Sequence, residues 1–105
     1  VSPTAYLELA LSSFQKKQYS MTEYYLDKLS KFKKPKLKAA MLTIRGMIEE
    51  DDKRLPEAVD YWNKALKLVP SYTPAKLNLG FLILLHPINV IDIKSISIVL
   101  IFSPC

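Results

Sequence analysis

The 105-residue chain contains only two glycines, one cysteine and one histidine. The lone cysteine, Cys105, excludes a disulfide framework, which needs cysteines in pairs, and it favours a reduced, cytoplasmic setting. Two glycines are too few for a collagen-like chain or for a glycine-rich loop that cradles phosphate. The histidine, His86, precedes a proline and has no serine or cysteine nucleophile in a recognisable motif near it. We therefore expect no enzymatic activity and no cofactor.

Charged and apolar residues are distributed unevenly along the chain. The formal net charge is +5, yet Asp92 and Lys94 are the only charged residues after residue 76. Isoleucine, by contrast, occurs six times from residue 88 onward. We accordingly divide the chain into a helical repeat domain, 1–87, and a hydrophobic C-terminal tail, 88–105.

The tail has a composition of its own. It alternates isoleucine and serine, as in Ile96-Ser97-Ile98, which favours a β-strand. It is too short and too interrupted for a membrane span, which needs about 20 apolar residues, so we expect no membrane partner. The tail does not continue the helical pattern of residues 1–87. One hypothesis is that it is an alternative or out-of-frame terminus. Because the chain opens on Val1 without a secretory signal, we expect it to be part of a longer protein.

Prolines and capping residues divide residues 3–87 into five predicted helices. Proline is favoured at the start of a helix and ends one that precedes it. The prolines that begin helices are Pro3, Pro35, Pro56 and Pro74, and those that end them are Pro70 and Pro87. Between them, apolar residues recur at helical spacing. Short connections between such helices predict an all-α stack of antiparallel hairpins.

Two polar motifs refine these boundaries. Ser20 and Glu23 have the spacing of a capping box, which predicts a second helix over 20–32. The acidic run Glu49–Asp52 is predicted to lie in the last turn of the third helix and the loop after it, where the basic residues that follow offset its unfavourable position at the helix C-terminus. This run lacks the spacing of a calcium-binding loop, so we expect no metal site.

A period of 35 residues relates three of the predicted helices. Ala10, Arg45 and Gly80 each follow a leucine or isoleucine and lie 35 residues apart. Such a period is typical of helical-hairpin solenoids. Gly46 offers a second register with a 34-residue spacing, but we favour Arg45 at the glycine position because this register buries an apolar face of the third helix. That face consists of Met41, Ile44 and Ile48.

The matched residues resemble those of the tetratricopeptide repeat family over about residues 3–85. Ala58-x3-Trp62, Ala65 and Pro70 match the second helix of that repeat, and Leu77-Asn78-Leu79-Gly80 matches the first helix of the next one. About two and a half repeats fit the chain. The residues assigned to structural repeat positions are Ala10, Ile44, Ala58, Trp62, Ala65, Pro70, Leu79 and Gly80.

The resemblance implies a protein–protein interaction module, a scaffold or adaptor that belongs to a larger protein. In such solenoids the first helix of each hairpin lines a concave groove. We expect the groove to be largely apolar and to bind a peptide or amphipathic helix of another protein. Its predicted lining is Leu7, Leu11, Phe14, Leu42, Glu49, Leu77 and Phe81. The alternative is that these side chains pack against a neighbouring repeat that is not in this chain.

Two other segments suggest further partners. Residues 77–85 carry no charge, although a terminal solenoid helix needs a polar outer face, so a following hairpin, the tail or a second copy is expected to cover them. A homodimer formed through residues 77–105 is one such arrangement. The stretch Lys28–Lys38 contains six lysines, and nucleic-acid or anionic-surface binding through it is the alternative function. Such a run is more often a solvated helix end, which argues against nucleic acid as the partner.

Overall fold

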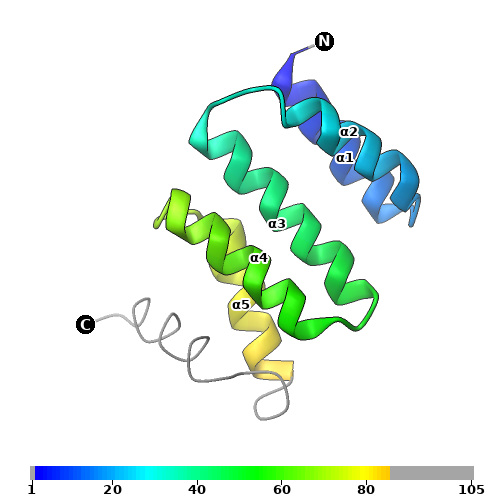
Figure 1. Cartoon of the computed structure of the whole chain (residues 1–105). Coiled ribbons are helices and arrows are strands. Elements are labelled where there is room, and N and C mark those ends of the chain that lie inside the picture. The colour runs from blue at the N-terminus through cyan, green and yellow to red at the C-terminus, as the bar shows by residue number, and fades with distance from the viewer. Residues whose placement is uncertain (1, 86–105) are drawn as a thin grey trace.

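The computed structural model describes residues 2–85, which form five α-helices (Figure 1). The helices are α1 (Pro3–Gln15), α2 (Tyr19–Leu29), α3 (Pro35–Asp51), α4 (Leu55–Leu68) and α5 (Thr73–Leu85). This confirms the predicted all-α fold of helical hairpins and its five helices. The predicted β-strand in the tail, 88–105, lies outside the described residues.

Most helix ends lie where the sequence predicts them. Pro3 is the first residue of α1, and the Ser2 hydroxyl accepts a hydrogen bond from the Ala5 amide at 3.2 Å. This cap satisfies an amide that has no partner within the helix. α4 ends just before Val69, which adopts an extended conformation with φ −135° and ψ 91°. The steric clash with the proline that follows it disfavours a helical conformation there.

The turns that connect α1 to α2 and α3 to α4 have the same geometry. Each contains a lysine in the left-handed region, Lys17 with φ 61° and Lys53 with φ 65°. The lysine amide donates to the carbonyl three residues earlier, and the next amide donates to the carbonyl five residues earlier. This Schellman arrangement satisfies the last carbonyls of the helix. It ends α3 at Asp51, which confirms the predicted place of the acidic run.

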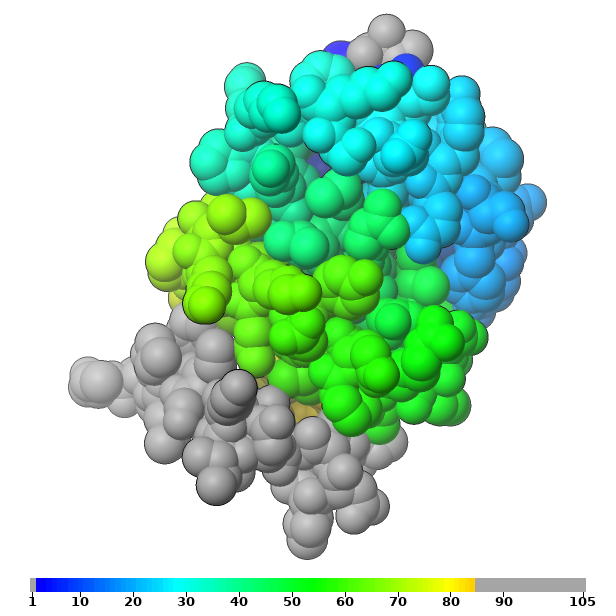
Figure 2. Space-filling view, in the orientation of Figure 1, coloured from blue at the N-terminus to red at the C-terminus, as the bar shows by residue number. Residues whose placement is uncertain are grey.

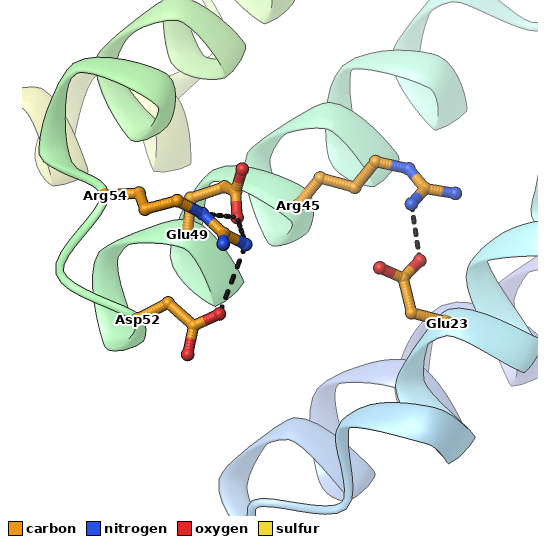
Figure 3. Close-up of polar contacts among 5 residues, drawn as sticks. All are labelled: Glu23, Arg45, Glu49, Asp52 and Arg54. Atoms are coloured by element: carbon orange, nitrogen blue, oxygen red, sulfur yellow. Dashed lines mark hydrogen bonds and ion pairs between the residues drawn. The ribbon is translucent and has the colours of Figure 1, made fainter.

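Both ends of α2 differ from the helix predicted over 20–32, because α2 begins at Tyr19 and ends at Leu29. The helix begins at Tyr19, its N-cap residue is Gln18, and no side chain caps it. Ser20 is thus already inside the helix, where its hydroxyl cannot act as a cap. Glu23 instead forms an ion pair with Arg45 of α3 (Figure 3). The predicted capping box is therefore wrong, because the Schellman turn brings the chain into α2 one residue earlier than the serine.

The helices pack as two hairpins and a fifth helix. α1 contacts α2, α3 contacts α4, and α5 contacts both α3 and α4. In Figures 1 and 2, α3 lies in the middle of the molecule, between α2 and α4. The N-terminal core, between the first hairpin and α3, consists of Ala10, Leu26, Leu29 and Ile44. The C-terminal core, between α3, α4 and α5, consists of Ala39, Ala58, Val59, Trp62, Ala65, Leu66, Ala75, Leu79 and Leu82.

Small residues allow the closest approach between the helices of each hairpin. Gly46 of α3 lies directly beneath the indole of Trp62, and a Cβ atom added to it would lie 2.8 Å from Cδ1 of that ring. The Trp62 side chain is completely buried, and its Nε1 donates to the Thr43 carbonyl at 3.0 Å. No bulkier residue than glycine fits there without moving the indole.

This contact corrects the register predicted for α3. Gly46, which lies 34 residues before Gly80, makes the close contact with Trp62, and Arg45 does not. The apolar face predicted for α3 is confirmed, because Ile44 is buried in the N-terminal core and Met41 and Ile48 pack against it. Arg45 is partly exposed and pairs with Glu23. Ala10 and Gly46 are both buried, and each lies seven residues before the left-handed lysine of its hairpin. Ala10 and Gly46 are 36 residues apart, whereas Gly46 and Gly80 are 34 residues apart. The single period of 35 residues used for the prediction is the average of these two spacings.

Candidate binding surfaces

A cleft of about 410 Å³ opens at the N-terminal ends of α1 and α3. Three successive parts of the chain line it, namely α1, the start of α3 and the residue just before α5. Its lining residues are Pro3, Thr4, Leu7, Lys34, Lys36, Leu37, Ala40 and Tyr72. Leu7 is the one predicted groove residue in this cleft.

The chemistry of the cleft combines an apolar floor with positive charge. Leu7, Leu37 and Ala40 are buried or half-buried, whereas Lys34 and Lys36 are exposed. Burial raises the pKa of Tyr72 above its ordinary value, so its hydroxyl is protonated at neutral pH and can donate a hydrogen bond. Helix N-termini also carry partial positive charge. The cleft can thus accommodate an apolar side chain that has an acidic neighbour.

The other two predicted groove residues of α1 have different surroundings. Leu11 is exposed and lies one helical turn after Leu7, so it is next to Leu7 on the surface of α1 but does not line the cleft. Phe14 is half-buried, and its ring meets the edge of Tyr19 with 6.0 Å between ring centres. The Lys17 ammonium lies 5.7 Å from the centre of the Phe14 ring. Phe14 therefore stabilises the turn of the first hairpin.

The two predicted groove residues of α3 are directed elsewhere. Leu42 packs against the C-terminal core. Glu49 accepts hydrogen bonds from Arg54, which also pairs with Asp52 (Figure 3). In the corrected register, the residues of α3 equivalent to Leu77 and Phe81 are instead Thr43 and Met47. The one-residue error in register placed the prediction on a neighbouring flank of the helix.

α5 has two apolar flanks, and only one of them is covered among the described residues. Ala75, Leu79 and Leu82 are buried in the C-terminal core. The predicted groove residues Leu77 and Phe81 are 54% and 59% exposed, and Leu84 is 78% exposed. Leu84 was missed, although its spacing of seven residues from Leu77 places it on the same flank.

A polar cluster connects the first hairpin to the end of α3. Asp51 accepts hydrogen bonds from the Tyr19 hydroxyl at 2.7 Å and from the Lys17 ammonium at 2.9 Å. Partial burial opposes ionisation of Asp51, but these two donors outweigh it and hold the pKa of the carboxyl below its ordinary value. The hydrogen bond to Asp51 in turn raises the pKa values of Lys17 and Tyr19. The cluster links the connection between α1 and α2 to the last residue of α3.

The lysine-rich stretch surrounds the connection between α2 and α3. The Lys28 ammonium lies 5.1 Å from the centre of the Tyr24 ring. Four of the remaining lysines are exposed, namely Lys31, Lys33, Lys34 and Lys36. Two of these four, Lys34 and Lys36, also line the cleft, so the basic stretch and the cleft meet at one end of the molecule.

Comparisons of the chain with protein-family models, with curated proteins and with solved structures give no match. Within residues 2–85, no helix has the length and apolar character needed to cross a membrane. The same residues bring together no group of three or more histidine, cysteine, aspartate or glutamate side chains able to hold a metal ion.

Proposed function

We propose that this chain is a protein-binding module of the tetratricopeptide-repeat type, acting as a scaffold or adaptor rather than as an enzyme. The observation that carries the proposal is the cleft at the N-terminal ends of α1 and α3, which is lined by both helices and by Tyr72 of the connection between α4 and α5. Convergence of several repeats on one surface is how a solenoid recognises an extended partner. The partner is a peptide or amphipathic helix of another protein, possessing apolar anchors at helical spacing.

The positive charge beside the cleft favours a partner that carries an acidic residue. Lys34 and Lys36 lie at its exposed edge, and the Tyr72 hydroxyl lines it. A partner with an acidic residue beside its apolar anchor gains both burial and ionic attraction. Exposed ion pairs contribute little by themselves, commonly below about 1 kcal/mol, so the apolar anchor is expected to supply most of the affinity.

Selection of a displayed random-peptide library against the full chain tests this function. We expect the selected peptides to share apolar residues at helical spacing with an acidic neighbour. Thr4→Trp, which fills the cleft from an exposed position, and Leu11→Asp should each weaken their binding at least tenfold. Leu68→Asp is the matched control, because Leu68 is an exposed leucine of α4 that does not line the cleft. Equal binding to all three variants would contradict the proposal.

Nucleic-acid or anionic-surface binding is the alternative function, and the exposed lysines around the α2–α3 connection favour it. Binding of this kind weakens steeply as salt is raised, because phosphate contacts release counterions. Titration of labelled single- and double-stranded oligonucleotides, and of anionic lipid vesicles, at two salt concentrations distinguishes this function. The alternative is rejected if the full chain shows no salt-dependent binding to any of them.

A further inference from the structure

Four exposed lysines lie in and beside the connection between α2 and α3. We call them the lysine strip, and they are Lys31, Lys33, Lys34 and Lys36. Lys34 and Lys36 line the cleft, whereas Lys31 and Lys33 lie outside its lining. An acidic partner that reaches all four lysines therefore has to extend past the cleft, along the connection.

The positive charge of the lysine strip is not compensated within residues 2–85. None of its lysines forms an ion pair there, and Asp27 is the only acidic residue between positions 24 and 48. At the opposite end of α3, by contrast, Lys17 pairs with Asp51, and the Arg54 guanidinium pairs with two carboxylates. Positive charge without a compensating carboxylate therefore gathers at the end of the molecule where the cleft opens.

The cleft beside the lysine strip favours a peptide over a nucleic acid as the polyanion. Leu7, Leu37 and Ala40 give the cleft an apolar floor. Single-stranded nucleic acids rely on exposed aromatic rings, on which their bases stack. Of the described residues that line the cleft, Tyr72 alone is aromatic, and it is half-buried. A peptide with an apolar anchor next to acidic side chains uses the cleft and the lysine strip together.

The exposure of the lysine strip determines what its charges contribute to binding. Exposed charges are screened over about 8 Å at physiological ionic strength, and exposed pairs add little to the strength of a complex. Charges at the rim of an interface act mainly on the association rate and on its salt dependence. We propose that the partner of the cleft carries a tract of acidic residues next to its apolar anchor, and that the lysine strip attracts this tract and accelerates association. This inference rests on the proposed peptide-binding function and extends it beyond a single acidic residue at the cleft.

Two displayed peptide libraries with the same random segment test the inference. One library carries a tail of four glutamates and the other a tail of four glutamines, and each is prepared with the tail before and after the segment. Selected peptides are resynthesised with both tails and a fluorescein label, and their binding to the full chain is followed by stopped-flow anisotropy. At about 50 mM salt the glutamate tail should raise the association rate constant at least fivefold and leave the dissociation rate constant within about twofold. At about 300 mM salt this advantage should be lost.

A matched pair of double variants locates the effect. Lys31→Gln with Lys33→Gln removes two charges outside the cleft and should slow the association of glutamate-tailed peptides at least threefold. Lys16→Gln with Lys53→Gln removes two exposed charges just after α1 and α3 and should leave the rate constant unchanged. The 17 residues of α3 separate the two ends of this helix by about 25 Å, which exceeds the screening length. Circular dichroism confirms that both variants are folded.

The outcomes separate this inference from the function on which it rests. If no peptide of either library binds the full chain, the proposed function fails and the inference fails with it. If peptides bind but the two tails give equal association rate constants, or both double variants slow association alike, the function stands and the inference is overturned. It is also overturned if the two tails bind alike while binding of a labelled oligonucleotide depends on Lys31 and Lys33, because the lysine strip would then belong to a nucleic-acid site.

Discussion

Adding one methyl group to each of the two glycines tests the packing that defines this fold. Both residues lie inside helices, where alanine is more favourable than glycine by about 0.8–1.0 kcal/mol. The surroundings differ, however. A Cβ atom at Gly46 would meet the buried Trp62 ring, whereas a Cβ atom at Gly80 would meet no atom of residues 2–85 within 4 Å. The same substitution is therefore expected to have opposite effects at equivalent positions of successive repeats.

The magnitudes follow from these surroundings. Gly80→Ala gains helix propensity without a clash, so we expect it to stabilise the chain by about 1 kcal/mol and to raise Tm by roughly 4–8 °C. Gly46→Ala has the same gain but overpacks the core, at a cost of about 1–3 kcal/mol. Displacing the indole also removes its hydrogen bond to the Thr43 carbonyl, and an unsatisfied buried donor costs about 1–3 kcal/mol. The net effect of Gly46→Ala is a destabilisation of about 1–5 kcal/mol.

Urea unfolding of the full chain, followed by circular dichroism at one protein concentration, measures both effects. A matching shift of Trp62 fluorescence in Gly46→Ala would locate the disturbance at the indole. If Gly46→Ala stabilised the chain as much as Gly80→Ala, Gly46 would not be in close contact with Trp62, and the corrected register would fail. If Gly80→Ala were destabilising, the flank of α5 around Gly80 would be in close contact with another part of the chain.

Three further results are expected. Lys53→Gly should stabilise the chain by about 0.5–1 kcal/mol, because glycine tolerates the left-handed conformation. Lys17→Gly should stabilise it less, because this variant also loses the ion pair with Asp51. Chemical denaturation compares the two variants, and an equal gain in stability would show that the ion pair does not contribute. Because the pKa of Asp51 is lowered in the folded state, its ionisation stabilises the fold at pH values above the ordinary aspartate pKa, and this contribution is lost as the pH falls through the folded-state pKa. On acidification, Tm should therefore fall less steeply in Asp51→Asn than in the unmodified chain. Parallel curves of Tm against pH would show that ionisation of Asp51 is not coupled to folding. Glu23→Gln should change the free energy of unfolding by less than about 1 kcal/mol, because the ion pair of Glu23 with Arg45 is partly exposed to solvent. Thermal unfolding measures this change, and a larger loss of stability would mean that the pair is shielded from water.

The candidate surfaces were only partly predictable. Helical periodicity was enough to predict the surface positions of Leu7, Leu11, Leu77 and Phe81. On α1 and on α5, apolar residues recur on a second flank of the helix besides the flank that forms the core. The cleft could not be predicted, since it depends on Tyr72, which follows α4 in the chain, lying beside α1. Such a contact depends on how the hairpins are stacked, and no local sequence pattern encodes that angle.

The sequence by itself determined the number of helices and most of their ends, because proline sterics and capping act over only a few residues. The tertiary structure decided which residues are equivalent between hairpins. A one-residue change of register is hard to detect in the helical pattern of α3, but it decides whether Gly46 or Arg45 faces the indole of Trp62. Close packing against a completely buried ring tolerates only the glycine. Among the described residues no ring lies above Gly80 of α5, so close packing does not require glycine there.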